Sequence, residues 1–239
     1  MPNTAVACPE DGSTETGSID RSTPGAPVQF QIYLPPCYKQ EASRSYPVLY
    51  LLHAAGGSPL IWNHYGAAEI ANRLIRSGQA PPFILVTPGL SSDKLSPTND
   101  LYTMLAYDFV PQIDSRFRTL ADRQHRAIAG ASFGGFVAGY VGFKFPDKFG
   151  SVGVFGAGLI DQQTERFNNW ITATPPEQRP RVLIDIGQED GIISFTTVLT
   201  QTLTQHDIPY TLIIKPGGHN YEYWASHLET YLLWFAGGW

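Results

Sequence analysis

The sequence predicts an α/β fold with a mostly parallel central sheet and helices on both faces. Apolar runs at 47–53, 83–87 and 181–186 have the composition of strands that are buried on both sides. Segments with apolar residues at helical spacing separate these runs. Such alternation of strands and helices is typical of a parallel sheet covered on both faces. The chain has 239 residues, a length at which an α/β fold commonly forms one domain.

The elements are justified by local patterns along the chain. Strands are expected at 28–34, 47–53, 83–87, 125–131, 149–155, 181–186 and 210–215. Helices are expected at 62–77, 101–117, from after 135 to about 145, 164–171, 194–205 and 221–235. The first strand alternates apolar and polar side chains, and Gly78 marks the end of the first helix. Pro111 is expected to kink or split the second helix, because proline has no N–H to donate.

The N-terminal part of the chain differs in composition from the rest. Residues 1–26 are rich in serine, threonine, glycine and proline, so we expect an irregular arm there and the folded domain at 27–239. The arm lacks the apolar core of a secretory signal. A cytoplasmic location is expected if Met1 is the native start, and a secreted one if a signal peptide was removed. Cys8 and Cys37 are either two unrelated thiols or one disulfide that ties the arm to the domain.

The overall composition argues against several classes of partner. Hydrophobic residues make up 43% of the chain and charged residues 15%, which is typical of a globular protein. The formal net charge of −5 argues against nucleic acid or an anionic membrane as the main partner. No apolar run approaches the roughly 18 residues of a membrane span.

The sharpest local signal is Gly-Ala-Ser-Phe-Gly-Gly at 130–135, which matches G-x-S-x-G. An expected strand precedes it and an expected helix follows, as this turn requires. The central Ser132 would project its hydroxyl from a strained turn, while the flanking glycines let neighbouring backbone approach closely. The helix start would direct N–H groups and its positive dipole end at an oxyanion. Ser132 is therefore the candidate nucleophile, and the alternative is a glycine-rich turn with an incidental serine.

A serine nucleophile needs a histidine base that an acidic residue orients. In sites built on this turn the chain order is serine, acid, histidine. His219 follows the last expected strand, and we expect the other histidines to be structural or solvated. The acid should follow the preceding strand, where Glu189 and Asp190 are adjacent. We favour Asp190 because it lies further into the loop, whereas Asp185 lies within the strand.

Acyl transfer also needs N–H donors for the tetrahedral oxyanion. We expect one from the backbone of Phe133, directly after the nucleophile, and one from Ala55 in the small-residue loop at 54–57. This loop taken alone is also consistent with a plain tight turn. The Phe133 side chain is expected either to limit the acyl pocket or to pack into the core beneath the turn.

Several separate segments resemble one enzyme family. They are YLPPCY at 33–38, YPVLYLLH at 46–53, DRQHRAIAG at 122–130 and GGHNYEYW at 217–224. From about residue 26 to the C-terminus the chain resembles the esterase family of the α/β-hydrolase superfamily. That family holds feruloyl and acetyl-xylan esterases, esterase D and the mycobacterial mycolyltransferases. The resemblance implies a single-domain α/β-hydrolase fold with Ser132, Asp190 and His219 as the catalytic triad.

The chain departs from the family pattern at a few positions. Ala54 and Cys37 stand where the family usually has glycine, and Phe133 stands where it usually has methionine or another residue. Ala54 would narrow the oxyanion loop, and Phe133 would crowd the acyl pocket. The specific motifs of esterase D are not apparent.

The residues and the resemblance together predict a serine carboxylic-ester hydrolase that works through an acyl-enzyme. The expected partner is a small-molecule or carbohydrate ester, either feruloyl-type or short-acyl. One alternative is an acyltransferase to a sugar hydroxyl with the same triad, and another is a non-catalytic carbohydrate-binding protein. No metal or organic cofactor is expected, and the oligomeric state is left open.

Aromatic residues on expected loops and helix starts are candidates for the mouth of the site. Such rings stack on phenolic acyl groups or on sugars, and each one is alternatively a core residue. The candidate substrate-binding residues are Trp62, Tyr102, Phe195, Tyr223 and Trp224.

Overall fold

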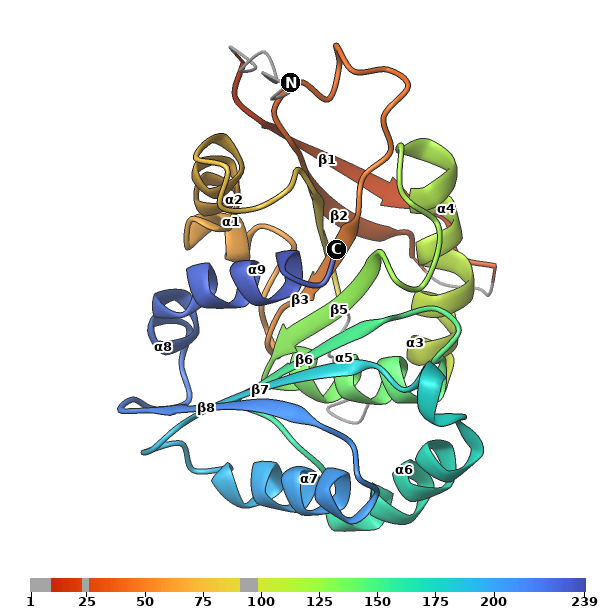
Figure 1. The fold of residues 1–239 in the computed structure, drawn as a ribbon, viewed down its shortest axis with the longest axis vertical. Coiled ribbons are helices and arrows are strands. Elements are labelled where there is room, and N and C mark those ends of the chain that lie inside the picture. Colours follow the sequence, from red (N-terminus) through yellow and green to blue (C-terminus); the bar gives the residue numbers. More distant parts are fainter. Residues whose placement is uncertain (1–9, 23–25, 91–98) are drawn as a thin grey trace, which may run out of the picture.

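The computed structural model describes residues 10–22, 26–90 and 99–239, without the side chains of residues 99 and 161–163. In this part of the chain an eight-stranded sheet runs in the order β1-β2-β4-β3-β5-β6-β7-β8 (Figure 1). The strands are β1 (Ser13–Ile19), β2 (Val28–Leu34), β3 (Val48–Leu52), β4 (Ile84–Pro88), β5 (Arg126–Ala131), β6 (Ser151–Phe155), β7 (Arg181–Gly187) and β8 (Tyr210–Lys215). β2 is antiparallel to both neighbours, and β4, β3 and β5 to β8 run parallel.

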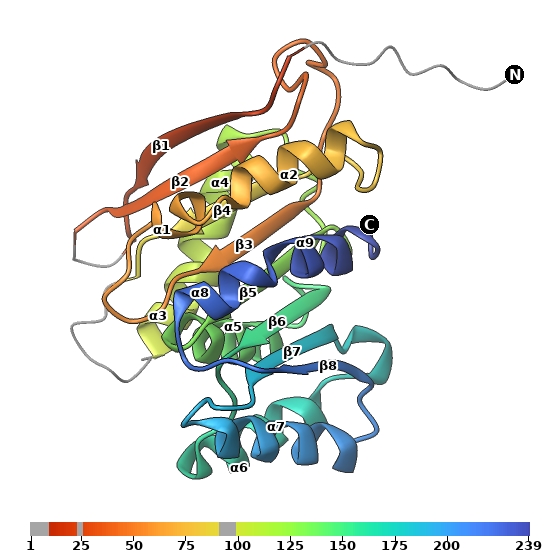
Figure 2. The same cartoon turned by 90° about the vertical axis from the view of Figure 1, so that its left-hand side faces the viewer.

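Helices cover both faces of the sheet (Figure 2). One face carries α1 (Ile61–His64), α2 (Ala67–Arg76), α8 (Tyr221–Ser226) and α9 (Leu228–Ala236). The other carries α3 (Asn99–Thr103), the π-helical turn η1 (Met104–Phe109), α4 (Val110–Arg116), α5 (Phe133–Lys144), α6 (Asp161–Ala173) and α7 (Ile193–Gln205), with the 3₁₀ turn η2 (Pro176–Gln178) before β7. Each face has its own cluster of buried apolar side chains. No helix in the described ranges is long and apolar enough to span a membrane.

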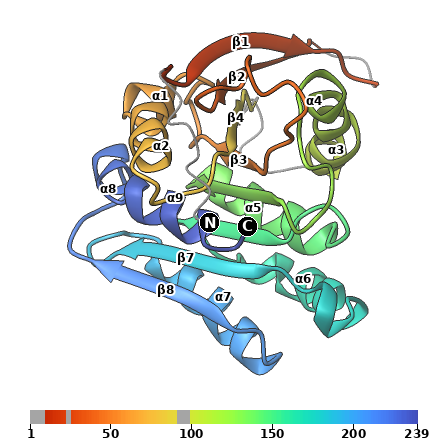
Figure 3. The same cartoon turned by 45° about the horizontal axis from the view of Figure 1, so that its top comes forward.

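The central strands explain why their sequences are continuously apolar. Every residue of β3, β4, β5 and β6 is buried, because helices lie against both sides of these strands. β8 lies at one end of the sheet, and none of its residues is fully buried. Figure 3 shows β1 and β8 at the two ends of the sheet. The predicted mostly parallel sheet with helices on both faces is confirmed.

The expected irregular arm at residues 1–26 contains a strand, which corrects the prediction. β1 pairs antiparallel with β2 along its whole length, from Ser13 opposite Leu34 to Ile19 opposite Val28. All but two of its side chains are exposed, so no apolar alternation marks the strand in the sequence. It is held mainly by backbone hydrogen bonds to β2 and by the buried Ile19. Cys8 lies outside the described residues, so the choice between two separate thiols and a Cys8–Cys37 disulfide is not tested.

Two expected helices depart from regular α-helix, one at a glycine and one before a proline. The helix expected at 62–77 is divided into α1 and α2 at Gly66, whose φ of 86° lies in the left-handed region that suits glycine. The helix expected at 101–117 does not split at Pro111. Instead η1 widens the helix into a π turn just before Pro111, which falls in the first turn of α4.

The parallel strands place the functional loops together. β3, β5, β6, β7 and β8 all end at the same edge of the sheet, so the loops that follow them are neighbours in space (Figure 1). In open α/β sheets such an edge is where ligands bind. The candidate nucleophile, acid and base each follow one of these strands.

Candidate active site

The turn between β5 and α5 holds Ser132 in a strained conformation. Its backbone angles, a φ of 52° and a ψ of −119°, lie outside the regions that residues other than glycine normally adopt. The Ser132 N–H donates to Phe155 O at 2.8 Å, which secures the turn to β6. A Cβ on Gly134 would lie 2.6 Å from His53 O, so only glycine fits where α5 passes β3. The glycine pattern thus lets the helix start pack closely while the serine hydroxyl projects from the sheet edge.

His219 joins the serine to an acidic residue. Its Nε2 lies 2.8 Å from Ser132 Oγ, and its Nδ1 lies 2.8 Å from Asp190 Oδ2. The Asp190 side chain has no exposed surface, whereas the His219 side chain is 34% exposed. The second Asp190 oxygen accepts from the Ile192 N–H at 3.0 Å. With the carboxylate holding Nδ1–H, Nε2 is left to accept the serine proton.

Glu189 has a different place from its neighbour. Its carboxylate accepts from the Gly217 N–H, and its own N–H donates to Gly217 O at 3.1 Å. These two bonds clasp the loop after β7 to the loop that carries His219. Of the two adjacent carboxylates, the structure therefore brings Asp190, and not Glu189, to the histidine.

Asp185 points away from this site, as its position inside β7 predicts. The fully buried carboxylate accepts from Tyr223 Oη at 2.5 Å and from Tyr231 Oη at 2.8 Å, and His227 Nδ1 lies 3.4 Å away. Burial raises the pKa of the Asp185 carboxyl, although the two tyrosine hydroxyls oppose that effect. The cluster ties β7 to α8 and α9, behind the loop that bears His219.

The two expected oxyanion donors follow the neighbouring strands β3 and β5. Phe133 N is the first amide of α5, and Ala55 N lies in the exposed part of the loop after β3. Among the described residues neither N–H has a hydrogen-bond acceptor. Both amides are therefore available to an oxygen bound beside Ser132, and the α5 dipole favours negative charge there.

The His53 ring supports the loop at 54–57 through a hydrogen bond to its first residue. The buried ring accepts from the Leu90 N–H at Nε2, at 2.8 Å, so its Nδ1–H donates to Ala54 O, also at 2.8 Å. Burial lowers the pKa of His53, which keeps the ring neutral. His53 is thus a structural residue, as expected from its position at the end of a buried strand.

Most aromatic candidates for the site mouth are core residues, which corrects that prediction. Trp62 is completely buried and donates from Nε1 to Leu52 O at 3.1 Å. Tyr102 is 3% exposed and packs on Tyr140 of α5. Tyr223 is 5% exposed and donates to Asp185. A position near a helix start does not show whether a ring is exposed, because burial depends on which helix or strand packs against it.

The remaining aromatic candidates are Trp224, which contacts His219, and Phe195, which lies at the start of α7 after Asp190. Trp224 is also buried, but its ring meets the His219 ring edge-on at 5.0 Å, so it packs beside the imidazole. Phe195, two residues into α7, is half-buried and lies edge-on to Phe136 of α5 at 6.0 Å. Phe133 is 6% exposed and belongs to the core cluster on the α5 face, so its side chain packs beneath the turn.

Tyr221 is a residue near the site that the sequence reasoning missed. Its hydroxyl accepts from the Ala54 N–H at 2.9 Å, so it touches the oxyanion loop directly. Tyr221 lies only two residues after His219. The signal for it was that proximity, but nothing in the sequence shows that the ring turns toward the loop after β3.

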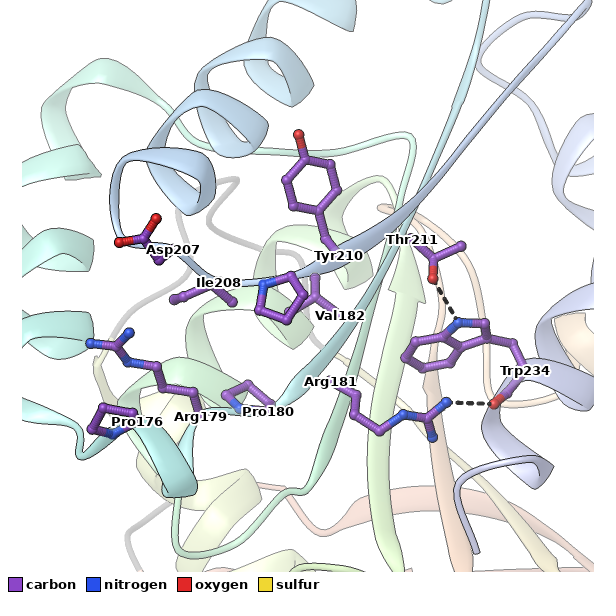
Figure 4. Close-up of a pocket in the computed structure, with 11 residues that line it drawn as sticks. Pro176, Arg179, Pro180, Arg181, Val182, Asp207, Ile208, Tyr210, Thr211 and Trp234 are labelled. Atoms are coloured by element: carbon purple, nitrogen blue, oxygen red, sulfur yellow. Dashed lines mark hydrogen bonds between the residues drawn. The ribbon is translucent and has the colours of Figure 1, made fainter.

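A cavity of about 420 Å³ lies at the opposite edge of the sheet (Figure 4). It lies beside the N-terminal ends of β7 and β8, and its lining includes Arg181, Tyr210 and Trp234. Arg181 stacks over the Trp234 ring at 4.3 Å, and the indole N–H donates to Thr211 Oγ1 at 3.0 Å. Ser132, Asp190 and His219 follow the C-terminal ends of β5, β7 and β8, at the other edge of the sheet, so this cavity is separate from them. The described side chains contain no group of three or more histidine, cysteine or acidic residues placed to bind a metal.

The family assignment follows from comparison with known proteins. The model of the family described as "Putative esterase" matches residues 22–235, which include Ser132, Asp190 and His219. This chain belongs to that esterase family. An endo-1,4-beta-xylanase/feruloyl esterase from Xylanibacter ruminicola is 36% identical over 141 residues. That match covers 53% of this chain and only 19% of the relative.

Solved structures agree with this esterase assignment at the level of the fold. A ferulic acid esterase superposes with a TM-score of 0.85 at 24% identity, covering 96% of this chain and 99% of that one. A feruloyl esterase module from Clostridium thermocellum, solved with sinapinate, superposes with a TM-score of 0.82 at 18% identity, covering 95% and 89%. The predicted α/β-hydrolase fold is confirmed.

Proposed function

We propose that this member of the esterase family is a serine carboxylic-ester hydrolase that works through an acyl-enzyme. The observation that carries the proposal is the continuous chain from Ser132 Oγ through His219 to Asp190, with both links at 2.8 Å. The strained turn at Ser132 and the two free amides beside it support the same chemistry.

In the proposed mechanism each group has a role in acylation. His219 Nε2 removes the proton from Ser132 Oγ as that oxygen attacks the ester carbonyl carbon. The carbonyl oxygen becomes an oxyanion that accepts from the N–H groups of Ala55 and Phe133. Asp190 holds the Nδ1–H tautomer and stabilises the imidazolium, which then protonates the leaving alcohol. Water attacks the acyl-enzyme with His219 again as the base, and Ser132 is restored.

The proposed substrates are feruloyl-type or short-acyl esters of carbohydrates. The relatives whose names are feruloyl or ferulic acid esterase support this substrate class. Phe136 and Phe195 also support it, because α5 and α7 present these half-buried rings close after Ser132 and Asp190. Aromatic rings that line a site stack on or meet the edge of a phenolic acyl group.

The proposed mechanism is tested by removing the nucleophile. Ser132→Ala should lower kcat on p-nitrophenyl acetate by on the order of 10³-fold or more, as triad knockouts do. A fluorophosphonate should label Ser132 in the unmodified chain. Ser115→Ala, which removes an exposed hydroxyl on α4, is the matched control and should keep full activity. Labelling at another residue, or activity retained by Ser132→Ala, would refute the mechanism.

The substrate class needs a separate panel of esters. Methyl ferulate, acetylated xylan and p-nitrophenyl esters of rising acyl length should show highest kcat/KM for the feruloyl or the short-acyl compounds. A preference for long acyl chains would overturn the proposed class while leaving the mechanism intact. Product analysis with a sugar acceptor present would reveal transfer of the acyl group instead of hydrolysis.

A further inference from the structure

We propose that Tyr221 is a positioning residue of the oxyanion hole: its hydroxyl orients the Ala54–Ala55 segment so that the Ala55 N–H faces the reacting carbonyl. The inference rests on the proposed serine hydrolase mechanism and adds to it a residue outside the triad. It concerns the link between the loop after β3 and the first residue of α8, which are 167 residues apart in the chain.

The first support is the hydrogen bond itself. The Ala54 N–H donates to Tyr221 Oη at 2.9 Å, while Ala54 O accepts from the His53 ring at 2.8 Å. The N–H and the carbonyl of Ala54 are therefore both held by side chains. The carbonyl of Ala54 and the N–H of Ala55 belong to one planar peptide unit, which the His53 bond holds. The Tyr221 bond holds the preceding peptide unit, and with both planes that flank the Ala54 Cα held, the direction of the Ala55 N–H is set.

The second support is how firmly the tyrosine ring is held. It stacks on Tyr65 with a centroid distance of 5.4 Å and an interplanar angle of 12°. It meets Trp62 edge-on at 5.6 Å and Trp224 edge-on at 5.3 Å. Trp62 and Trp224 are both buried, and Trp224 also contacts the His219 ring. The hydroxyl is thus placed by packed rings, one of which, Trp224, also borders His219.

The third support is the space kept for the hydroxyl. A Cβ on Gly57 would lie 2.7 Å from Tyr221 Oη, so glycine at this position lets the phenol reach the loop. Burial raises the pKa of Tyr221, so the phenol stays neutral and its oxygen remains a hydrogen-bond acceptor that carries no charge. A neutral acceptor orients the loop without opposing the negative charge that develops on the oxyanion.

Tyr221→Phe tests the inference because it removes the hydroxyl and keeps the ring. Loss of a whole oxyanion donor costs about 100-fold to 1,000-fold in kcat, so loss of its orientation should cost less, about tenfold. We expect kcat on p-nitrophenyl acetate to fall by that factor with KM nearly unchanged. Tyr65→Phe is the matched control, because its hydroxyl bonds Glu222 on the surface and does not touch Ala54.

A second measurement separates positioning from general loosening of the fold. The thionocarbonyl analogue of the same ester puts sulfur, a weaker acceptor, where the oxyanion forms. The ratio of kcat/KM for the oxygen ester to that for the thiono ester therefore reports the oxyanion hydrogen bonds. We expect this ratio to fall about severalfold in Tyr221→Phe and to stay at the wild-type value in Tyr65→Phe. Because it is a ratio within one variant, it does not depend on the fraction of folded protein.

The outcomes distinguish this inference from the proposed function. Tyr221→Phe with wild-type kcat, or with a reduced kcat but an unchanged oxygen-to-thiono ratio, would overturn the positioning role. Neither result would touch the mechanism, which fails only if Ser132→Ala retains activity. An equal drop of the ratio in both tyrosine variants would also refute the inference, since only one of the two hydroxyls reaches the oxyanion loop.

Discussion

At the scale of single residues, neighbours in the sequence have separate tasks. Asp190 is buried and bonds the imidazole of His219, while the exposed Glu189 fastens the loop that carries it. Ser132 projects from the turn, while Phe133, the next residue, offers its amide to the site and its side chain to the core. Each pair gives a prediction that separates the two tasks.

The two carboxylates should respond very differently to amide substitution. Asp190→Asn should lower kcat by up to about 10⁴-fold, because an amide in this place favours the wrong tautomer of His219. Glu189→Gln should lose much less activity, since its amide oxygen still accepts from the Gly217 N–H. Steady-state kinetics of both variants on p-nitrophenyl acetate decide this, and the reverse order of losses would move the acid role to Glu189.

Phe133→Ala should act on stability more than on substrate choice. The ring is 6% exposed within the core cluster, so its removal leaves a cavity that should cost about 3–5 kcal/mol of unfolding free energy. The backbone N–H remains, so hydrolysis of acetate should persist. Thermal melting and the turnover ratio of p-nitrophenyl octanoate to acetate are the measurements. A large gain on octanoate with an unchanged melting temperature would show instead that the ring lines the acyl pocket.

At the scale of elements, buried polar side chains connect the strands to the helices behind them. Asp185 of β7 receives hydrogen bonds from Tyr223 of α8 and Tyr231 of α9. This junction lies directly below the loop that carries His219, because α8 begins two residues after the imidazole. Because burial raises the pKa of Asp185, the contribution of this junction to the stability of the fold depends on pH.

The Asp185 junction should stabilise the fold most at low pH. Because burial raises the pKa of Asp185 in the folded state, the folded chain holds this proton more tightly than the unfolded chain. Its contribution is complete below the usual carboxyl pKa of about 3.9 and is lost as pH rises through the folded-state pKa. Asp185→Asn does not titrate. Its melting temperature relative to that of the wild type should therefore be higher at pH 7 than at pH 4, and a difference that stays constant would contradict this.

At the scale of the whole molecule, the sheet extends beyond the strands that carry the site. β1 adds an antiparallel edge strand next to β2, so part of the expected arm belongs to the sheet. At the other end of the sheet β8 is largely exposed, yet the loop that follows it bears His219. The site therefore depends on strands from the middle and from one end of the sheet.

The structural role of β1 is open to a direct test. Ile19 is completely buried, so Ile19→Ala should cost about 2–5 kcal/mol of unfolding free energy. Thr16→Ala changes an exposed residue of the same strand and should alter stability by less than about 0.5 kcal/mol. Denaturant unfolding of both variants measures the difference. Equal stability of the two variants would mean that residues 13–19 are not part of the folded sheet.

The sequence by itself determined the features that are encoded locally. The turn at 130–135 needs glycines and a serine in adjacent positions, so six residues were enough to identify the strained turn and the candidate nucleophile. The buried central strands were visible as apolar runs, because helices cover both of their faces. Strand β1 could not be predicted, because most of its side chains are exposed and backbone hydrogen bonds to β2 do not require an apolar pattern in the sequence.

Only the tertiary structure decided which side chains meet across the chain. Nothing local makes Trp62 or Tyr223 a core residue, because their burial depends on elements distant in the sequence. The sequence favoured Asp190 over Glu189, but only the folded loop shows that Asp190 bonds the imidazole while Glu189 bonds the Gly217 N–H. The contact of Tyr221 with Ala54 likewise joins the start of α8 to the loop after β3, and only the folded sheet brings these segments together.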